Sequence, residues 1–425
     1  MRYLLVLLCC AEILLATYLM NVAGPFWSPV LFLGTSLAIA FVYLRMQSQS
    51  ATTVASFSLP PVVISVGQVA VFAGCAFYIV SKLKYVWWYH LMYHFPEGTS
   101  DIIPQVEALV QRFLSGSAPY RPINFTDYQL YPTYLPLQWL PYIPAELAHK
   151  DYRWIPALAM LAASVYYFVS KRKMEGDPIS RILLPSWPLY IWTLLLLNDN
   201  NSFVFTVEGL IAAYYFFVAE STGKKSIWPL AIGVSLCLFS RYSIIFWVPL
   251  CIAVLAMAGQ KKNAMIVAGT AAAFFIFVYW LPFLRVNPEI FIKGYRYHTF
   301  AAYNEWNNDF SWNAGTVYLN NGLGFTSYAI AWFPGDLHHK LALYKNLLFA
   351  VCLLAVTLLG LVFYRSRGKY DVSTYLLFSF KIYIAVFYAF IQIPYRYLFF
   401  TPLIITAALL GGAFMPRVKN NTMIA

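Results

Sequence analysis

The sequence has few charged residues for its length. Lysine, arginine, aspartate and glutamate make up 11% of its 425 residues, and hydrophobic residues make up 61%. A soluble protein uses roughly 25% charged residues. This composition excludes a soluble globular enzyme and predicts a chain that lies mostly within a lipid bilayer.

Cysteine pairs and nucleotide-binding motifs are also missing. All six cysteines lie in apolar runs without a CxxC pair, which is typical of small core residues rather than of disulfides or thiolate metal sites. No Walker A motif, dinucleotide-binding glycine fingerprint or zinc-ligand spacing occurs. We expect no metal site and no cofactor, and leave a requirement for a divalent metal open.

The net charge of +12 does not predict nucleic-acid binding. The basic residues are spread over short loops rather than gathered on one face. Contact with anionic lipid headgroups accounts for this pattern. We therefore expect membrane lipids, and no nucleic acid, among the partners.

Twelve apolar runs are long enough, or nearly so, to cross a bilayer. About 20 helical residues span a hydrocarbon core roughly 30 Å thick. The sequence thus predicts an all-α polytopic membrane protein with about twelve transmembrane helices. The runs lie near 3–20, 29–45, 62–82, 154–170, 182–197, 203–219, 227–240, 243–258, 264–284, 346–364, 371–391 and 397–413.

Short basic segments orient these spans. They fall on one side if all twelve runs cross, and that side is cytoplasmic by the positive-inside rule. The long loops 83–153 and 285–345 then face outward, and we expect them to contain interfacial helices. We expect the protein in the plasma (inner) membrane. The basic segments are 171–181, 220–226, 259–263, 365–369 and 416–421.

The segment 131–147 is apolar but contains four prolines, which break helical hydrogen bonding. Counting it as a full span would move the basic loop 171–181 to the outside. We favour an interfacial or re-entrant segment, because non-helical backbone at membrane depth persists only where protein or water covers it.

A polar stretch, 97–136, lies in the first outer loop. Apolar residues in 104–116 recur at helical spacing, which predicts an amphipathic helix on the membrane surface that ends at Gly116. Asp101 precedes this helix, and it is either a helix cap or the carboxylate of an active site. Loops of this length usually have a function.

Two parts of the chain carry a family likeness. They are the loop residues Ser100, Asp101, Gly116, Pro119, Tyr120, Tyr131 and Pro132, and the segment PYRYLFFTPLI at 394–404. Together they resemble the membrane-embedded glycosyltransferases with the GT-C fold, and among these the polyprenol-phosphate-mannose-dependent, mannosyltransferase-like group. The likeness covers the chain from about residue 80 onward. It implies a GT-C-like catalytic domain at 61–425 and two extra N-terminal transmembrane helices at 1–60.

The resemblance also implies an activity. Asp101 would be the catalytic base, and Arg396 would face the phosphate of a lipid-linked donor. The enzyme would move a sugar, mannose by family likeness, from polyprenyl phosphate to a glycan or glycolipid acceptor, with inversion, during cell-envelope glycan synthesis. The chain departs from some relatives in having one acidic residue at this position rather than an Asp-x-Asp pair.

The chemistry of sugar transfer predicts further residues. An alcohol needs a base to act as a nucleophile, and a departing phosphate needs cations, for which the planar guanidinium group is suited. Arg241, Arg296 and His298 are basic and lie near the outer membrane surface, so we assign them, with Arg396, to the lipid phosphate. A snorkelling anchor is the alternative for each arginine.

Three further residues are candidates for binding the sugar or the acceptor: Tyr120, Asp127 and Asn200. For Asn200 an ordinary loop is the competing interpretation. Lys381 lies within an apolar span, where a charge usually marks a functional site or an ion pair. Glu208 is one candidate partner for it.

A multi-span transporter or flippase of lipid-linked glycans is the alternative function. It also requires many spans and intramembrane charges, and it predicts inverted repeats with broken helices near the midplane. The sequence shows no convincing repeat, and its polar residues concentrate in the outer loops. A non-catalytic scaffold, in which Asp101 and Arg396 would be replaceable, is a third reading.

Overall fold

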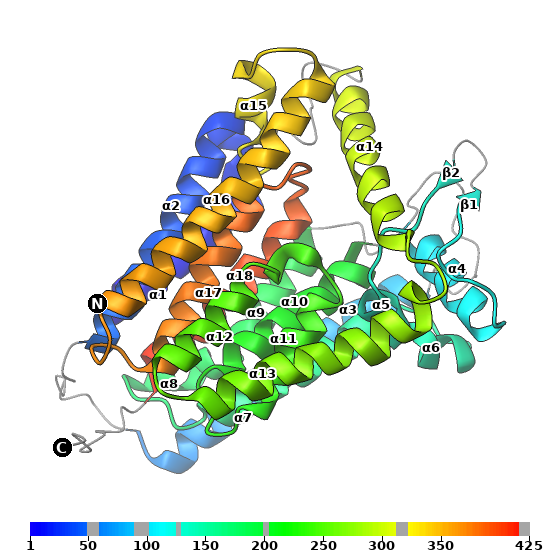
Figure 1. Cartoon of the computed structure of the whole chain (residues 1–425). Coiled ribbons are helices and arrows are strands. Elements are labelled where there is room, and N and C mark those ends of the chain that lie inside the picture. Colours follow the sequence, from blue (N-terminus) through cyan, green and yellow to red (C-terminus); the bar gives the residue numbers. More distant parts are fainter. Residues whose placement is uncertain (49–58, 89–101, 125–128, 199–203, 312–321, 416–425) are drawn as a thin grey trace.

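The computed structural model describes residues 1–48, 59–88, 102–124, 129–198, 204–311 and 322–415. Helices make up most of this part of the chain, and its one sheet is a short antiparallel pair, β1 (Ile123–Asn124) and β2 (Gln129–Leu130). Within these ranges the protein is an all-α polytopic membrane protein, as the composition predicts (Figure 1).

Eight helices of the described residues are long and apolar enough to cross a membrane. They coincide with eight of the predicted runs, and the total of twelve remains a prediction. The eight are α1 (Arg2–Leu14) with the π-helix η1 (Leu15–Leu19), α2 (Met20–Ser48), α3 (Pro61–Trp88), α7 (Trp154–Lys171), α13 (Lys261–Phe274) with the π-helix η5 (Phe275–Leu284), α16 (Leu337–Arg365), α17 (Val372–Ala389), and the 3-10 helix η6 (Arg396–Phe399) with α18 (Phe400–Ala413).

The four other predicted runs form further helices of the same bundle. They contain α8 (Pro178–Leu183), η3 (Leu184–Ser186), α9 (Trp187–Asn198), α10 (Val204–Ser221), α11 (Trp228–Leu238), η4 (Tyr242–Ile244) and α12 (Trp247–Met257).

The bundle helices differ in exposure. In α17 and α18, 72% and 78% of the apolar windows are buried, against 17% for α3 and for α13–η5. Helices α17 and α18 therefore form the core, and α3 and α13–η5 face lipid.

Two of the predicted cytoplasmic segments, 171–181 and 220–226, lie together at one end of the bundle. Arg2 forms an ion pair with Glu175 at 3.5 Å, and the backbone N–H of Glu175 donates to the carbonyl of Phe414 at 2.7 Å. Lys171 pairs with Glu220 at 3.2 Å. These contacts join the N-terminus and the end of α18 to two of the predicted inner segments, so the grouping agrees with the predicted topology, while its direction across the membrane rests on the positive-inside rule.

The opposite end carries α14 (Ile290–Ser311) and α15 (Thr326–Trp332). Figure 1 shows α14 rising from the end of η5 toward the first turns of α16, beside the bundle rather than within it. Trp306 of α14 donates its indole N–H to the carbonyl of Gln392 at 2.8 Å, and Gln392 donates to the carbonyl of Leu341 at 2.8 Å. Hydrogen bonds thus fix α14 to α16 and to the chain between α17 and α18.

The amphipathic helix predicted at 104–116 is α4 (Ile102–Leu114). Gly116 has φ +73° and the N–H of Ser117 bonds to the carbonyl of Arg112 at 2.8 Å, which is a Schellman-type end. The apolar face does not lie on the membrane as we expected. Its central residues Val106 and Leu109 are fully buried, and the helix packs against α10 and the 136–147 segment.

The proline-rich segment contains three short helices, α5 (Pro136–Trp139), η2 (Leu140–Tyr142) and α6 (Ile143–Leu147). No single helix runs through it, because prolines interrupt the hydrogen-bond ladder. Its backbone is held by protein instead, since the N–H of Leu137 donates to the carbonyl of Phe239 at 2.9 Å. This arrangement supports the reading in which the segment is not a full span.

Candidate functional site

Arg241 lies at the end of the bundle opposite the basic loops, in the extended link between α11 and η4. Its guanidinium group donates two hydrogen bonds to Glu208 of α10, one from Nη1 to Oε2 at 2.7 Å and one from Nη2 to Oε1. Nη1 also reaches the hydroxyl of Tyr388 at 3.3 Å. Arg241 is therefore already bound to a carboxylate, in the bidentate geometry that suits arginine.

The pairing suggested between Lys381 and Glu208 is wrong. Lys381 forms its ion pair with Glu12 of α1, Nζ to Oε1 at 2.5 Å, and both side chains are fully buried. The sequence offered a signal that we did not use, since Glu12 is the lone acidic residue in the first apolar run. A separation of 369 residues hid the contact, which requires α1 to pack against the core helix α18.

Hydrogen bonds satisfy this buried pair on both sides. The hydroxyl of Thr406 donates to Oε2 of Glu12 at 2.6 Å, and Ser36 donates to Oε1. Lys381 also donates to the carbonyl of Pro402 at 2.9 Å. Burying two charges is costly unless further hydrogen bonds satisfy them, and here the two helices α2 and α18 supply those bonds. The arrangement is that of a structural link between the N-terminal helices and the core.

Arg396 is held by backbone from the N-terminal helices. Its Nε donates to the carbonyl of Ala16 at 3.1 Å, and its Nη2 donates to the carbonyl of Thr17. Both carbonyls belong to the π-helix η1, and π-helical turns occur frequently at functional sites. The helix η6 that carries Arg396 also packs against α10, so Arg396 and Glu208 belong to elements in contact.

The second long loop contributes Arg296 and His298, both exposed on α14. Desolvation, with the positive charges of Lys345 and Arg241, lowers the pKa of His298 to about 4. The imidazole is therefore neutral at pH 7, and His298 lies close enough to Arg241 for the charge of the arginine to act on it. Among the residues that the structure describes, no interaction of this kind joins Arg296 to Arg241.

Lys345, at the start of α16, is the basic residue that our assignment from sequence missed. Its Nζ donates to the hydroxyl of Thr299 at 2.7 Å and lies 3.4 Å from the centre of the Tyr295 ring. Both partners are on α14. Lys345 directly precedes the apolar run 346–364, a position we could have recognised as a cation at headgroup level.

Tyr120 lies inside an aromatic cluster rather than on an open surface. Its hydroxyl donates to the carbonyl of Tyr134 at 2.9 Å and accepts the indole N–H of Trp139 at 3.1 Å. Its ring also packs against Phe283, with centroids 5.4 Å apart. With 5% of its surface exposed, Tyr120 holds the first outer loop against η5, and a structural role accounts for its contacts.

Asp101, Asp127 and Asn200 fall outside the described residues. Helix α4 begins at the residue after Asp101 and packs against α10, the helix that carries Glu208. Among the residues that the structure describes, no group of three His, Cys, Asp or Glu side chains could hold a metal ion.

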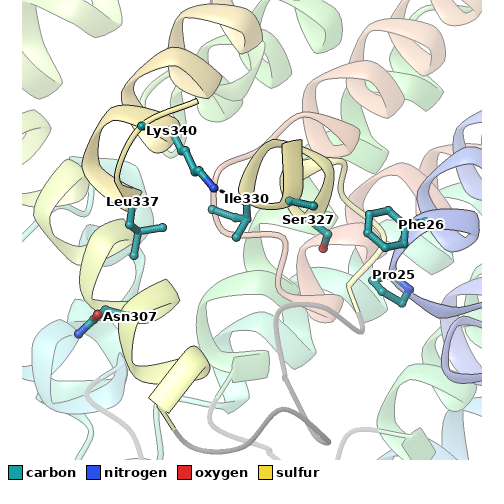
Figure 2. Close-up of a pocket in the computed structure, with 9 residues that line it drawn as sticks. Pro25, Phe26, Asn307, Ser327, Ile330, Leu337 and Lys340 are labelled. Atoms are coloured by element: carbon teal, nitrogen blue, oxygen red, sulfur yellow. Dashed lines mark hydrogen bonds between the residues drawn. The ribbon is translucent and has the colours of Figure 1, made fainter. Parts of the chain in front are cut away.

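A pocket of about 490 Å³ opens at the same end of the protein, between the start of α2 and helices α14, α15 and α16. Figure 2 shows Phe26 and Pro25 on one side, Asn307 on the other and Lys340 above. The amine of Lys340 is bound to the carbonyl of Ile330 at 2.6 Å. The lining residues are Pro25, Phe26, Asn307, Ser327, Ile330, Ala331, Gly335, Leu337 and Lys340.

The fold and these contacts define a class: a polytopic α-helical membrane protein with charged groups gathered at one end of its bundle. No protein-family model matches the chain, and no curated protein or solved structure matches it. The function therefore has to be argued from the site itself.

Proposed function

We propose that the protein is a glycosyltransferase that moves a sugar from a polyprenyl-phosphate donor to an acceptor hydroxyl at the outer side of the membrane. The observation that carries this proposal is the position of the basic groups. Arg241 and Lys345 come from different parts of the chain, and the positive charge of each acts on His298 at the end of the bundle opposite the basic loops. Cations at that level suit the phosphate of a lipid donor, which lies in the headgroup region.

The chemistry needs a base and an anion site. Asp101 would take the proton of the acceptor hydroxyl as that oxygen attacks the anomeric carbon, and the bond from this carbon to the phosphate oxygen would break. One displacement inverts the anomeric configuration, and the phosphate leaves on its lipid. Mannose and an acceptor in a cell-envelope glycan are proposed from the family resemblance, as is a site on the outer face of the plasma (inner) membrane.

The role of Arg396 in this reaction is a further part of the proposal. Arg396 donates to the carbonyls of Ala16 and Thr17 from one side of its guanidinium group. The N-terminal helices would orient Arg396 within the site.

The test is transfer of radiolabelled mannose from polyprenyl-phosphate-mannose in membranes that contain the protein or its Asp101→Asn variant, at equal accumulation. We expect transfer by the first and none by the second, because the variant lacks a base. Normal transfer by Asp101→Asn would mean that Asp101 serves only as a helix cap and not as the base. No transfer by either protein would contradict the choice of mannose or the activity itself.

A transporter or flippase is the second candidate, and the buried pair Glu12–Lys381 favours it. Ionisable residues within a membrane often belong to ion or substrate pathways. The same experiment separates the two functions if it is run with sealed vesicles. A transporter would move the lipid-linked sugar across the bilayer without breaking its bond to phosphate.

A further inference from the structure

Lys345 differs from Arg241 in having no carboxylate beside it among the residues that the structure describes. Its amine donates to the Thr299 hydroxyl at 2.7 Å and lies 3.4 Å from the centre of the Tyr295 ring. Both are neutral, and the amine keeps a further N–H for another acceptor. The charge of Lys345 is therefore not balanced by the groups that hold it.

Arg241 adds a second charge to the same surroundings. Glu208 balances Arg241 through a bidentate pair, so this carboxylate has little capacity left for Lys345. Both cations act on His298, which is neutral at pH 7 and can donate one hydrogen bond. The charge of Lys345 is the one that is left without a counter-charge among these groups, and an anion beside it would supply that counter-charge.

The position of Lys345 indicates which kind of anion would bind. Helix α16 is long and apolar enough to cross a bilayer between Leu337 and Arg365, and within it the uninterrupted apolar run follows Lys345. Tyr295 beneath the amine is an aromatic residue of the type found at membrane interfaces. An anion bound here would lie at the depth of lipid headgroups.

We propose that Lys345, with His298 and Arg241, forms a phosphate-binding site that takes a phosphate monoester carried on a membrane lipid. Lys345 supplies the unbalanced charge and a charge-assisted hydrogen bond. His298 supplies a neutral donor, and Arg241 contributes its field while it stays bound to Glu208. The choice of a lipid as carrier rests on the proposed function, whereas the phosphate chemistry rests on the three side chains.

Binding to the full-length protein in phosphatidylcholine nanodiscs tests this site. The probes are farnesyl phosphate, farnesol and inorganic phosphate, each titrated by calorimetry. We expect farnesyl phosphate to bind, and the Lys345→Met variant to bind it roughly tenfold to a hundredfold more weakly, because a hydrogen bond to a charged group is lost. Lys345→Arg should retain most of the affinity, which shows that the fold tolerates replacement at this position.

Lys293→Met is the matched control, since Lys293 is an exposed lysine of α14 paired with Glu289 at 2.7 Å, and it should bind like the wild type. Equal binding by Lys345→Met and wild type would overturn the proposal, as would a wild type that binds farnesol equally well. Stronger binding of inorganic phosphate would overturn the lipid carrier. Sugar transfer without this binding contradicts the site alone, and binding without transfer contradicts the proposed enzyme alone.

Discussion

Two groups of charged residues in this protein differ in how their charges are balanced. Inside the bundle, Glu12 and Lys381 are fully buried, and hydroxyl and carbonyl groups complete their hydrogen bonds. At the bundle end, Arg241 has its own carboxylate, while Lys345 contacts only a hydroxyl and an aromatic ring in the described part of the chain. The charges of the first group balance each other, and the second group has a net positive charge.

This difference separates structural from ligand-binding charges. A fully buried pair whose two charges balance each other has little to offer a ligand, and its removal should affect folding. A cation with a spare donor near the surface can bind an anion at little structural cost. Sequence position alone would have ranked Lys381, in the middle of a span, as the more functional residue.

The largest expected effect is the loss of one partner of the buried pair. Lys381→Met leaves the Glu12 carboxylate buried without its cation, and we expect the free energy of unfolding to fall by about 3–5 kcal/mol. Thermal unfolding in detergent measures the effect. The double variant Glu12→Gln with Lys381→Met should be more stable than the single one, because no charge is left buried. A double variant no better than the single would contradict this account.

Glu208→Gln should lower the stability of the protein and strengthen its binding of phosphate at the bundle end. Arg241 loses its carboxylate, so we expect a loss of about 1–3 kcal/mol in stability. The freed positive charge should at the same time strengthen the binding of farnesyl phosphate. Denaturant unfolding and calorimetry on the same preparation give both values. Weaker binding in this variant would mean that Arg241 acts only when Glu208 holds it in place.

Tyr120→Phe should have a smaller effect. It removes the acceptor of the Trp139 indole N–H and the donor to the Tyr134 carbonyl, and we expect a loss of about 1 kcal/mol in stability. Sugar transfer should continue at the wild-type rate if the role of Tyr120 is structural. A large rise in KM for the acceptor, without a loss of stability, would restore Tyr120 to the sugar-binding residues.

The smallest effect concerns the titration of His298. Its pKa of about 4 in the folded protein lies below the ordinary value of about 6.5. The unfolded state therefore binds more protons between these values, and this residue makes stability rise with pH from about 4 to 6.5. Lys345→Met removes one positive neighbour and should raise the pKa, as followed by NMR of labelled histidine. An unchanged pKa would place the two residues too far apart to share a site.

The sequence predicted local features better than distant pairings. Helix α4 and its end at Gly116 followed from apolar spacing and from glycine's tolerance of positive φ. The grouping of the basic loops 171–181 and 220–226 at one end followed from charge alone. The apolar face of α4 was assigned to the membrane because periodicity shows that a face is buried but not what buries it.

Pairings across the bundle could not be read from the sequence. Glu12 meets Lys381, and Arg396 meets the carbonyls of Ala16 and Thr17, only because the N-terminal helices pack on the core. Arg241 was identified as an outer cation, but its partner Glu208 was not, because sequence order does not show which residues of the neighbouring helices α10 and α11 come to the same place. Lys345 was overlooked because a lysine at the end of a span is usually an anchor.

A cryo-EM map of the full-length protein in nanodiscs that contain polyprenyl phosphate tests the central claim most directly. We predict density for the phosphate within hydrogen-bond distance of the Nζ of Lys345, beside His298, with the prenyl chain running along the lipid-facing side of the bundle. Phosphate density elsewhere, for instance at Lys340 in the pocket near Phe26, with Lys345 bound only to Thr299, would contradict the account.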